Sequence, residues 1–215
     1  MIISIGIQCT SKSFKNEIEN THTFPFDWMF SSPSFVLEML ELLLEKNIDI
    51  GDLVKNHFYK CDKRAKLCGC EHYYTCENGF ALYNTKYNVI FPHDKYDDET
   101  IEKYIRRFQR LKDTIINSPE DIYFLYTSQS SLESGNFTID KNVIIKDVYA
   151  NLTKIYKFIG KFRNNYKLIL FDSIQDEQIE LLDKNIILYK LNKCNGWPAL
   201  LDQMREYKHL FTKNC

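Results

Sequence analysis

A cysteine and a histidine in this sequence have the chemistry of a nucleophile and a base, and both lie where strands are expected to end. Cys9 follows the apolar segment 2–8 and precedes a segment with helical spacing. A thiol at a helix N-terminus is favoured as the thiolate, because the helix dipole and free N–H groups stabilise negative charge. His93 follows the apolar segment 88–91 and is the best-placed imidazole to accept its proton. The alternatives are a buried apolar cysteine and a histidine that only hydrogen-bonds a loop.

Such a pair needs a third polar group that orients the imidazole ring. Asp94, Asp172 and Asn195 are the candidates. Asp94 directly follows His93, and adjacent residues have poor geometry for a bond from carboxylate to ring. We name Cys9, His93 and Asp94 as the candidate catalytic residues. Because the geometry of Asp94 is poor, we keep Asp172 and Asn195 as alternatives for the orienting role.

Alternating strands and helices must position these residues. Continuous apolar runs at 122–126 and 167–171 are typical of parallel strands buried on both faces. Further strands are expected at 2–8 and 186–191, and a hairpin from 80–83 and 88–91. Helical spacing is expected at 10–19, 35–45 (capped by Ser34), 50–57, 101–115 (capped by Asp98), 148–162, 174–182 and 197–210, with a loop at 131–143. The sequence predicts one three-layer α/β domain over 1–215, mainly a parallel sheet with helices on both faces, with a small hairpin and an irregular Cys-rich insertion at 58–79.

Polar residues follow the expected strands, and in open parallel sheets ligands bind at the carboxyl ends of the strands. Beyond Cys9 and His93-Asp94, these residues are Thr127-Ser128-Gln129, Asp172-Ser173 and the segment around Asn192 to Asn195. We expect them to form one polar edge, with Ser128 as a substrate-binding residue.

The segment from Thr21 to Ser34 is a loop that contains Phe24-Pro25-Phe26-Asp27-Trp28. In a functional interpretation, the loop folds over the strand ends, Asp27 orients a catalytic group and Trp28 walls the pocket, so both contact substrate. In a structural interpretation, Phe26 and Trp28 fill the core while Asp27 caps a turn. The sequence leaves both interpretations open.

A cysteine-rich cluster lies apart from these residues and consists of Cys61, Cys68, Cys70, His72 and Cys76. Thiolate and imidazole ligands suit tetrahedral zinc, but the cluster lacks the Cys-x-x-Cys pair of standard structural sites. Reduced thiols in a loop are the alternative. We assign no metal to the catalytic residues.

The composition excludes several classes of function. The chain has 215 residues, a net charge of −1 and 44% hydrophobic residues, so it carries no basic field for nucleic acid or for a membrane surface. We expect neither a signal peptide nor a membrane span, and therefore a cytoplasmic protein whose seven cysteines are reduced or bind metal. Glycine-rich nucleotide motifs are absent, so we expect no cofactor.

Several of these segments resemble an uncharacterised family that is named for a papain-like cysteine peptidase activity and occurs in bacteria and large DNA viruses. They are Ser4-Ile5-Gly6 with Cys9, then Phe24-Pro25-Phe26-Asp27-Trp28, Phe91-Pro92-His93-Asp94, and Arg106-Arg107-Phe108. The resemblance covers roughly residues 2–130. It implies that Cys9 is the nucleophile and His93 its base, in the order along the chain that papain relatives have.

The leading hypothesis is therefore a thiol hydrolase that acts on a protein or a glycan-linked substrate. One alternative is an enzyme that processes glycans or sugar esters at the same strand ends. The other is a non-catalytic domain whose polar rim binds a protein or a glycan. Fast alkylation of Cys9 at neutral pH would favour the first hypothesis. Binding of nucleotide sugars or oligosaccharides would favour the second, and tolerance of Cys9→Ser without loss of function the third. The oligomeric state is left open.

Overall fold

The computed structural model describes residues 1–6, 9–19, 22–29, 31–60, 81–84, 89–128, 148–173, 182–192 and 197–212. The side chains at 9, 59, 60, 81–84, 89–93 and 197 lie outside this description. In chain order the elements are β1 (Ile2–Ser4), α1 (Cys9–Ile18), α2 (Pro33–Leu40), the π-helical turn η1 (Glu41–Glu45), α3 (Ile50–His57), β2 (Tyr59–Lys60), β3 (Ala81–Asn84), β4 (Val89–Lys95), α5 (Asp98–Asn117), β5 (Ile122–Thr127), α7 (Val148–Ile159), β6 (Tyr166–Asp172), β7 (Ile187–Lys190), α8 (Trp197–Arg205) and α9 (His209–Thr212).

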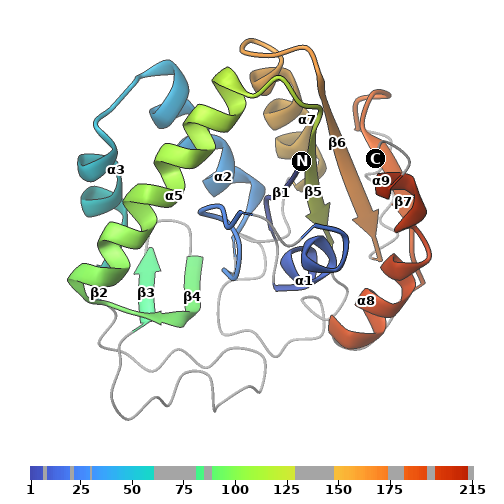
Figure 1. Cartoon of the computed structure of the whole chain (residues 1–215), viewed down its shortest axis with the longest axis horizontal. Coiled ribbons are helices and arrows are strands. Elements are labelled where there is room, and N and C mark those ends of the chain that lie inside the picture. The colour runs from blue at the N-terminus through green and yellow to red at the C-terminus, as the bar shows by residue number, and fades with distance from the viewer. Residues whose placement is uncertain are drawn as a thin grey trace.

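Four strands form a parallel sheet in the order β1-β5-β6-β7. In register, Ser4 of β1 pairs with Leu125 of β5, and Leu125 pairs with Ile169 of β6. In Figure 1 the arrowheads of β5 and β6 point toward the end of the molecule where α1 and α8 lie. The carboxyl ends of the strands therefore share one edge, as the sequence predicted.

Helices cover both faces of this sheet. Ile3 and Phe124 belong to a core that includes residues of α2, α5 and α7, and α2 packs against α7. Ile2 and Leu125 belong to a second core with residues of α1 and α8, which also contact each other. Neighbouring residues of one strand thus enter different cores, because side chains alternate along a strand. The predicted three-layer α/β fold with a mainly parallel sheet is confirmed.

The expected hairpin is present as β3 and β4, which pair antiparallel; β3 also pairs antiparallel with β2, so the three strands form a separate sheet in the order β2-β3-β4. The prediction that His93 and Asp94 follow a strand is wrong, because both lie within β4, which runs on to Lys95. The register explains the extension. Leu82 pairs with Phe91 while the next partner pair is Ala81 with Lys95, so residues 92–94 span an irregularity. Pro92, which has no N–H for a ladder bond, is tolerated at such a position.

Two predicted helix caps are displaced. The cap of α2 is Ser32, not Ser34: the Ser32 Oγ accepts a hydrogen bond from the Phe35 amide at 3.3 Å. Pro33 then occupies the first helical position, which suits its fixed φ and missing N–H. The cap of α5 is Asp97, not Asp98, and its Oδ1 accepts from the Thr100 amide at 2.8 Å.

Three further boundaries differ or lie outside the description. β1 ends at Ser4, four residues short of the strand expected at 2–8. The expected closing helix is divided into α8 and α9. The predicted loop at 131–143 and nearly all of the predicted helix at 174–182 lie outside the described residues. Within the described part of the chain, none of the helices combines the length and apolarity that a membrane span requires.

Candidate functional site

The chain turns sharply between β1 and α1, and this turn determines where Cys9 lies. Gly6 has φ 127°, a conformation that L side chains rarely adopt. A Cβ at this position would lie 2.7 Å from the Ser31 Oγ, so a side chain has no room there. The Gly6 carbonyl accepts a hydrogen bond from the Ser11 Oγ at 2.5 Å, and this hydroxyl also lies 2.8 Å from the Thr127 Oγ1 at the end of β5. The first turn of α1 is thereby fixed to the carboxyl edge of the sheet.

Cys9 is the first residue of α1, as the sequence predicted, but it is the fifth residue after the end of β1 and does not directly follow the strand. Its side chain lies outside the described residues, so the prediction that it is the nucleophile stays a prediction. The backbone of Cys9 does lie at the N-terminus of a helix, which is the part of the prediction that the structure tests. A group at the start of α1 faces the positive end of the helix dipole.

Asp27 is the centre of a buried ionic cluster that joins the 22–29 segment to α1. Its carboxylate is 0% exposed, and Oδ2 accepts from the Phe24 amide at 2.9 Å. The same oxygen lies 3.2 Å from the Lys12 Nζ and 4.0 Å from the Lys15 Nζ, both buried in α1. The Lys15 ammonium also donates to the His22 carbonyl and lies over the Phe24 ring, 4.6 Å from its centroid. We call Lys12, Lys15 and Asp27 the α1 ionic cluster.

The surroundings of Lys15 disfavour its charged form. Burial lowers the Lys15 pKa to about 8, and Lys12 also lowers it, whereas the carboxylates of Asp27 and Glu19 act in the opposite direction. The ammonium groups of Lys12 and Lys15 both lie beside the same buried oxygen, Asp27 Oδ2. The other oxygen, Asp27 Oδ1, has no hydrogen-bond partner among the described residues.

The loop that carries Asp27 also has a structural role. Phe26 is 1% exposed and packs edge-on against Phe35 of α2 and Phe108 of α5. Trp28 is only partly buried and adopts a positive φ of 62°, a strained value for a bulky residue. The structural interpretation of this loop is confirmed for Phe26, which fills the core, and for Asp27, which binds the Phe24 amide of its own turn; the functional interpretation stays a prediction. The roles of Asp27 and Trp28 in substrate binding stay predictions.

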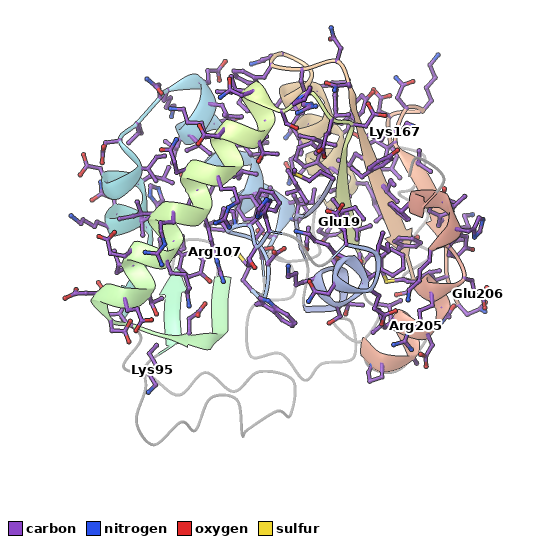
Figure 2. The ribbon with its side chains drawn as sticks, viewed as in Figure 1. Glu19, Lys95, Arg107, Lys167, Arg205 and Glu206 are labelled. Atoms are coloured by element: carbon purple, nitrogen blue, oxygen red, sulfur yellow. The ribbon has the colours of Figure 1, made fainter. Side chains whose placement is uncertain are left out.

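Asp94 connects β4 to α5. Its Oδ1 accepts from the Lys103 Nζ, and its Oδ2 accepts from the Tyr104 hydroxyl at 2.6 Å. Tyr104 is fully buried, and its pKa is raised well above the usual value, first by desolvation and then by the Asp94 carboxylate. Asp27 also raises the Tyr104 pKa, whereas the Arg107 guanidinium, 5.2 Å from the ring centroid, lowers it. Figure 2 shows Arg107 on the side of α5 that faces the centre of the molecule.

Tyr104 therefore lies within electrostatic reach of two carboxylates that are far apart in sequence. One is Asp27, which binds the helix of Cys9, and the other is Asp94, the neighbour of His93 on β4. Of these two carboxylates, Asp94 accepts a hydrogen bond from the Tyr104 hydroxyl, and Asp27 contributes least to the shift of the Tyr104 pKa. The His93 side chain lies outside the described residues, and its role as base stays a prediction.

A second polar cluster occupies the ends of β5 and β6. The buried Ser128 donates a hydrogen bond from Oγ to the Asp172 Oδ1 and accepts one from the Ser173 amide at 3.1 Å. The Tyr149 hydroxyl of α7 donates to the same Asp172 oxygen at 3.2 Å. The predicted polar edge is therefore present at these two strands. Ser128 is 1% exposed and bound within the protein, and its assignment to substrate stays a prediction.

Sequence reasoning missed Lys12, Lys15 and Tyr104. Lysines are rarely fully buried unless they are paired, so a pattern-based analysis assigns them to the solvent face of a helix. The one available signal was their i, i+3 spacing in a short helix with few apolar residues. Tyr104 lies within the helix expected at 101–115, but its bond to Asp94 depends on how β4 packs.

Two predictions fall outside the described residues: the cluster Cys61, Cys68, Cys70, His72 and Cys76, and the candidate Asn195. Within the described ranges, no group of three or more His, Cys, Asp or Glu residues is arranged to hold a metal ion.

A comparison with protein families gives one match. The family model described as "Putative papain-like cysteine peptidase (DUF1796)" matches residues 1–156, which contain Cys9, the α1 ionic cluster, His93 and Asp94. No curated protein and no solved structure matches the chain.

Proposed function

The chain belongs to this family, and from that premise we propose that it is a thiol hydrolase with Cys9 as nucleophile and His93 as general base. The observation that carries the proposal is the position of Cys9 as the first residue of α1, beyond the carboxyl end of β1. Thiolates are favoured at helix N-termini, and reactive cysteines occur in electropositive surroundings. The buried lysines of the next helical turn supply such surroundings.

The proposed reaction is an acyl transfer. The Cys9 sulfur attacks the carbonyl carbon of the substrate, and the resulting tetrahedral intermediate expels the leaving amine or alcohol, which takes a proton from the His93 imidazolium. A thioester remains on Cys9. Water then attacks the thioester carbonyl while His93 accepts its proton, and the carboxylic acid is released with the thiolate restored. A peptide or another acyl group on a protein or glycan is the substrate class that we propose.

The strand β4, which carries His93, is attached to α5 through Asp94. Asp94 follows His93 on β4, and both of its carboxylate oxygens accept hydrogen bonds from α5. We propose that Asp94 stabilises the strand that carries the base. Two partners already bind this carboxylate, which agrees with the poor geometry that adjacent residues have for a bond to the ring.

The test combines chemical labelling with activity. Iodoacetamide alkylation of Cys9 at pH 7, followed by mass spectrometry of the Cys9 peptide, is expected to be at least roughly tenfold faster than alkylation of glutathione. In a peptidyl-aminocoumarin library, Cys9→Ala and His93→Ala are each expected to lose roughly a thousandfold or more of any hydrolysis that the wild type shows. Their melting temperatures should stay within about 2 °C of the wild type, since neither change removes a large core side chain.

Two outcomes contradict the proposal. One is alkylation of Cys9 no faster than that of glutathione, which means that the thiol is ordinary. The other is hydrolysis that survives Cys9→Ala in protein of verified sequence and purity.

A further inference from the structure

Two buried lysines lie in the first two turns of α1, and they face one buried carboxylate from the 22–29 segment. Lys12 is 3% exposed, and Lys15 and Asp27 are 0% exposed. The two ammonium nitrogens lie 3.2 and 4.0 Å from the same Asp27 oxygen. With both lysines protonated, the α1 ionic cluster has a net charge of +1. A buried charge without compensation is costly, and perturbed buried charges are concentrated at functional sites, so this surplus is a candidate functional feature.

Among the residues that the structure describes, the other charged groups around these lysines do not remove the surplus. Glu19 is the further carboxylate that acts on Lys15, and it lies one helical turn beyond Lys15, away from the first turn of α1. Its Oε1 accepts a hydrogen bond from the Ile2 amide at 2.5 Å, and its side chain is 23% exposed. From the 22–29 segment, Lys15 meets the His22 carbonyl and the Phe24 ring, which are neutral.

Helix geometry identifies the position on which the surplus charge acts. Positions 9 and 12 of α1 are separated by i, i+3 spacing, which places two residues on one helical face with Cβ atoms about 5–6 Å apart. We propose that Lys12, supported by Lys15, supplies the positive charge that keeps the Cys9 thiol in its thiolate form. The inference rests on the proposed function, since it takes Cys9 as the nucleophile. Lys12 is here a positioning residue that acts through Cys9 and does not touch substrate.

Asp27 sets the strength of this effect. Its Oδ2 holds both ammonium groups beside the helix and neutralises one of the two charges. With neither lysine the first turn would have only the helix dipole, and with a second buried carboxylate the surplus would vanish. The fully buried Oδ1, which has no partner among the described residues, provides an acceptor on the same carboxylate for a further proton donor of the site.

The pH dependence of Cys9 alkylation tests the inference. Full-length protein is reacted with iodoacetamide at a series of pH values between about 5 and 10, which span the range of perturbed and ordinary thiols, and Cys9 is quantified by mass spectrometry after proteolysis. In Lys12→Met the midpoint is expected to rise by about one pH unit, so that at a pH below both midpoints the thiolate fraction of Cys9 falls roughly tenfold. The limiting rate at high pH should not fall and should rise by up to about threefold, because the thiolate is then fully formed in both proteins and a thiolate of higher pKa is the stronger nucleophile.

Matched variants separate charge from structure. Lys12→Arg keeps the charge and should hold the midpoint within about 0.3 units of the wild type. Lys208→Met removes a lysine that pairs with Glu17 at the other end of α1, and it should leave the midpoint unchanged. Where Lys12→Met fails to fold, as judged by circular dichroism, Lys15→Met provides the same test with a smaller expected rise.

The outcomes distinguish this inference from the proposed function. A wild-type midpoint near the ordinary thiol value of about 8.5 overturns the proposed function, and this inference with it. A low wild-type midpoint that neither Lys12→Met nor Lys15→Met changes overturns this inference alone. A midpoint that Lys12→Arg shifts as far as Lys12→Met does shows that packing, not charge, was responsible.

Discussion

Arg163 and the Lys12–Lys15 pair are all buried cations, and they lie near opposite ends of the parallel sheet. Arg163 precedes β6, at the amino ends of the strands, and is 7% exposed. Its guanidinium donates to the carbonyls of Thr114, Ile115, Glu120 and Asn165 and to the Asn165 amide oxygen, over distances from 2.6 to 3.3 Å. All three of its nitrogens have partners. The two lysines, in contrast, share one carboxylate oxygen of Asp27.

This difference separates a structural cation from one that is available to act on a site. The planar guanidinium of Arg163 donates hydrogen bonds to carbonyls at the end of α5 and in the loop before β5. Carbonyls at a helix end lack partners within the helix. Burial lowers the Arg163 pKa, but no other cation competes for its acceptors. In the α1 ionic cluster, positive charge exceeds negative charge beside the helix that begins with Cys9. Unbalanced buried charge of this kind is concentrated at functional sites.

The largest effect is expected from Asp27→Asn, which removes the one carboxylate between two buried lysines. Breaking a buried ion pair leaves a charge without compensation, so we expect a loss of about 4 kcal/mol in the free energy of unfolding. Urea denaturation at pH 7 measures this loss. Asp113→Asn is the control, since this exposed aspartate bonds only Gln109 and should change stability by less than about 0.5 kcal/mol. A loss below about 1 kcal/mol for Asp27→Asn would contradict the charge balance described for the cluster.

Arg163→Met is expected to cost about 3 kcal/mol, because it removes the buried hydrogen bonds to Thr114 and Ile115 and those that join the end of α5 to Glu120 and Asn165. Arg163→Lys keeps the charge but not the planar set of donors and should lose less. Urea denaturation gives the stability, and iodoacetamide labelling gives the pH midpoint of Cys9. That midpoint should not shift in either variant. A shift in folded Arg163→Met protein would show that the two cations are not independent.

The sequence predicted the central fold well because the signals are local. The strands at 122–126 and 167–171 lie within one residue of β5 and β6 at each end, since uninterrupted apolar runs of this length are typical of buried parallel strands. The caps were displaced because Ser32 competes with Ser34, and Asp97 with Asp98, and local sequence does not choose between them.

Features that depend on distant contacts escaped prediction. The extension of β4 through Pro92 needs the pairing of Ala81 with Lys95 across a register shift. The site was predicted in part: the helix position of Cys9 follows from its neighbours in sequence. The burial of Lys12 depends on Asp27, which lies outside α1, so the i, i+3 spacing of the lysines within α1 does not by itself predict it.

The smallest expected effect, and the sharpest test of how the lysines differ from Arg163, is the pH dependence of Lys15→Met. Burial lowers the Lys15 pKa from 10.5 to about 8, so between these values the unfolded chain binds more protons than the folded protein. Stability therefore rises with pH in this window, and the cost of burying the charged ammonium is fully present below about pH 8.

Relative to Lys15→Met, the wild type should gain about 2 kcal/mol in the free energy of unfolding between about pH 8 and pH 10. Urea denaturation of both proteins at each pH measures this difference. Lys154→Met, which removes an exposed lysine of α7, should follow the wild type at every pH. Parallel curves for wild type and Lys15→Met would mean that Lys15 keeps its ordinary affinity for protons in the fold. The α1 ionic cluster would then resemble Arg163, a cation whose nitrogens all have hydrogen-bond acceptors.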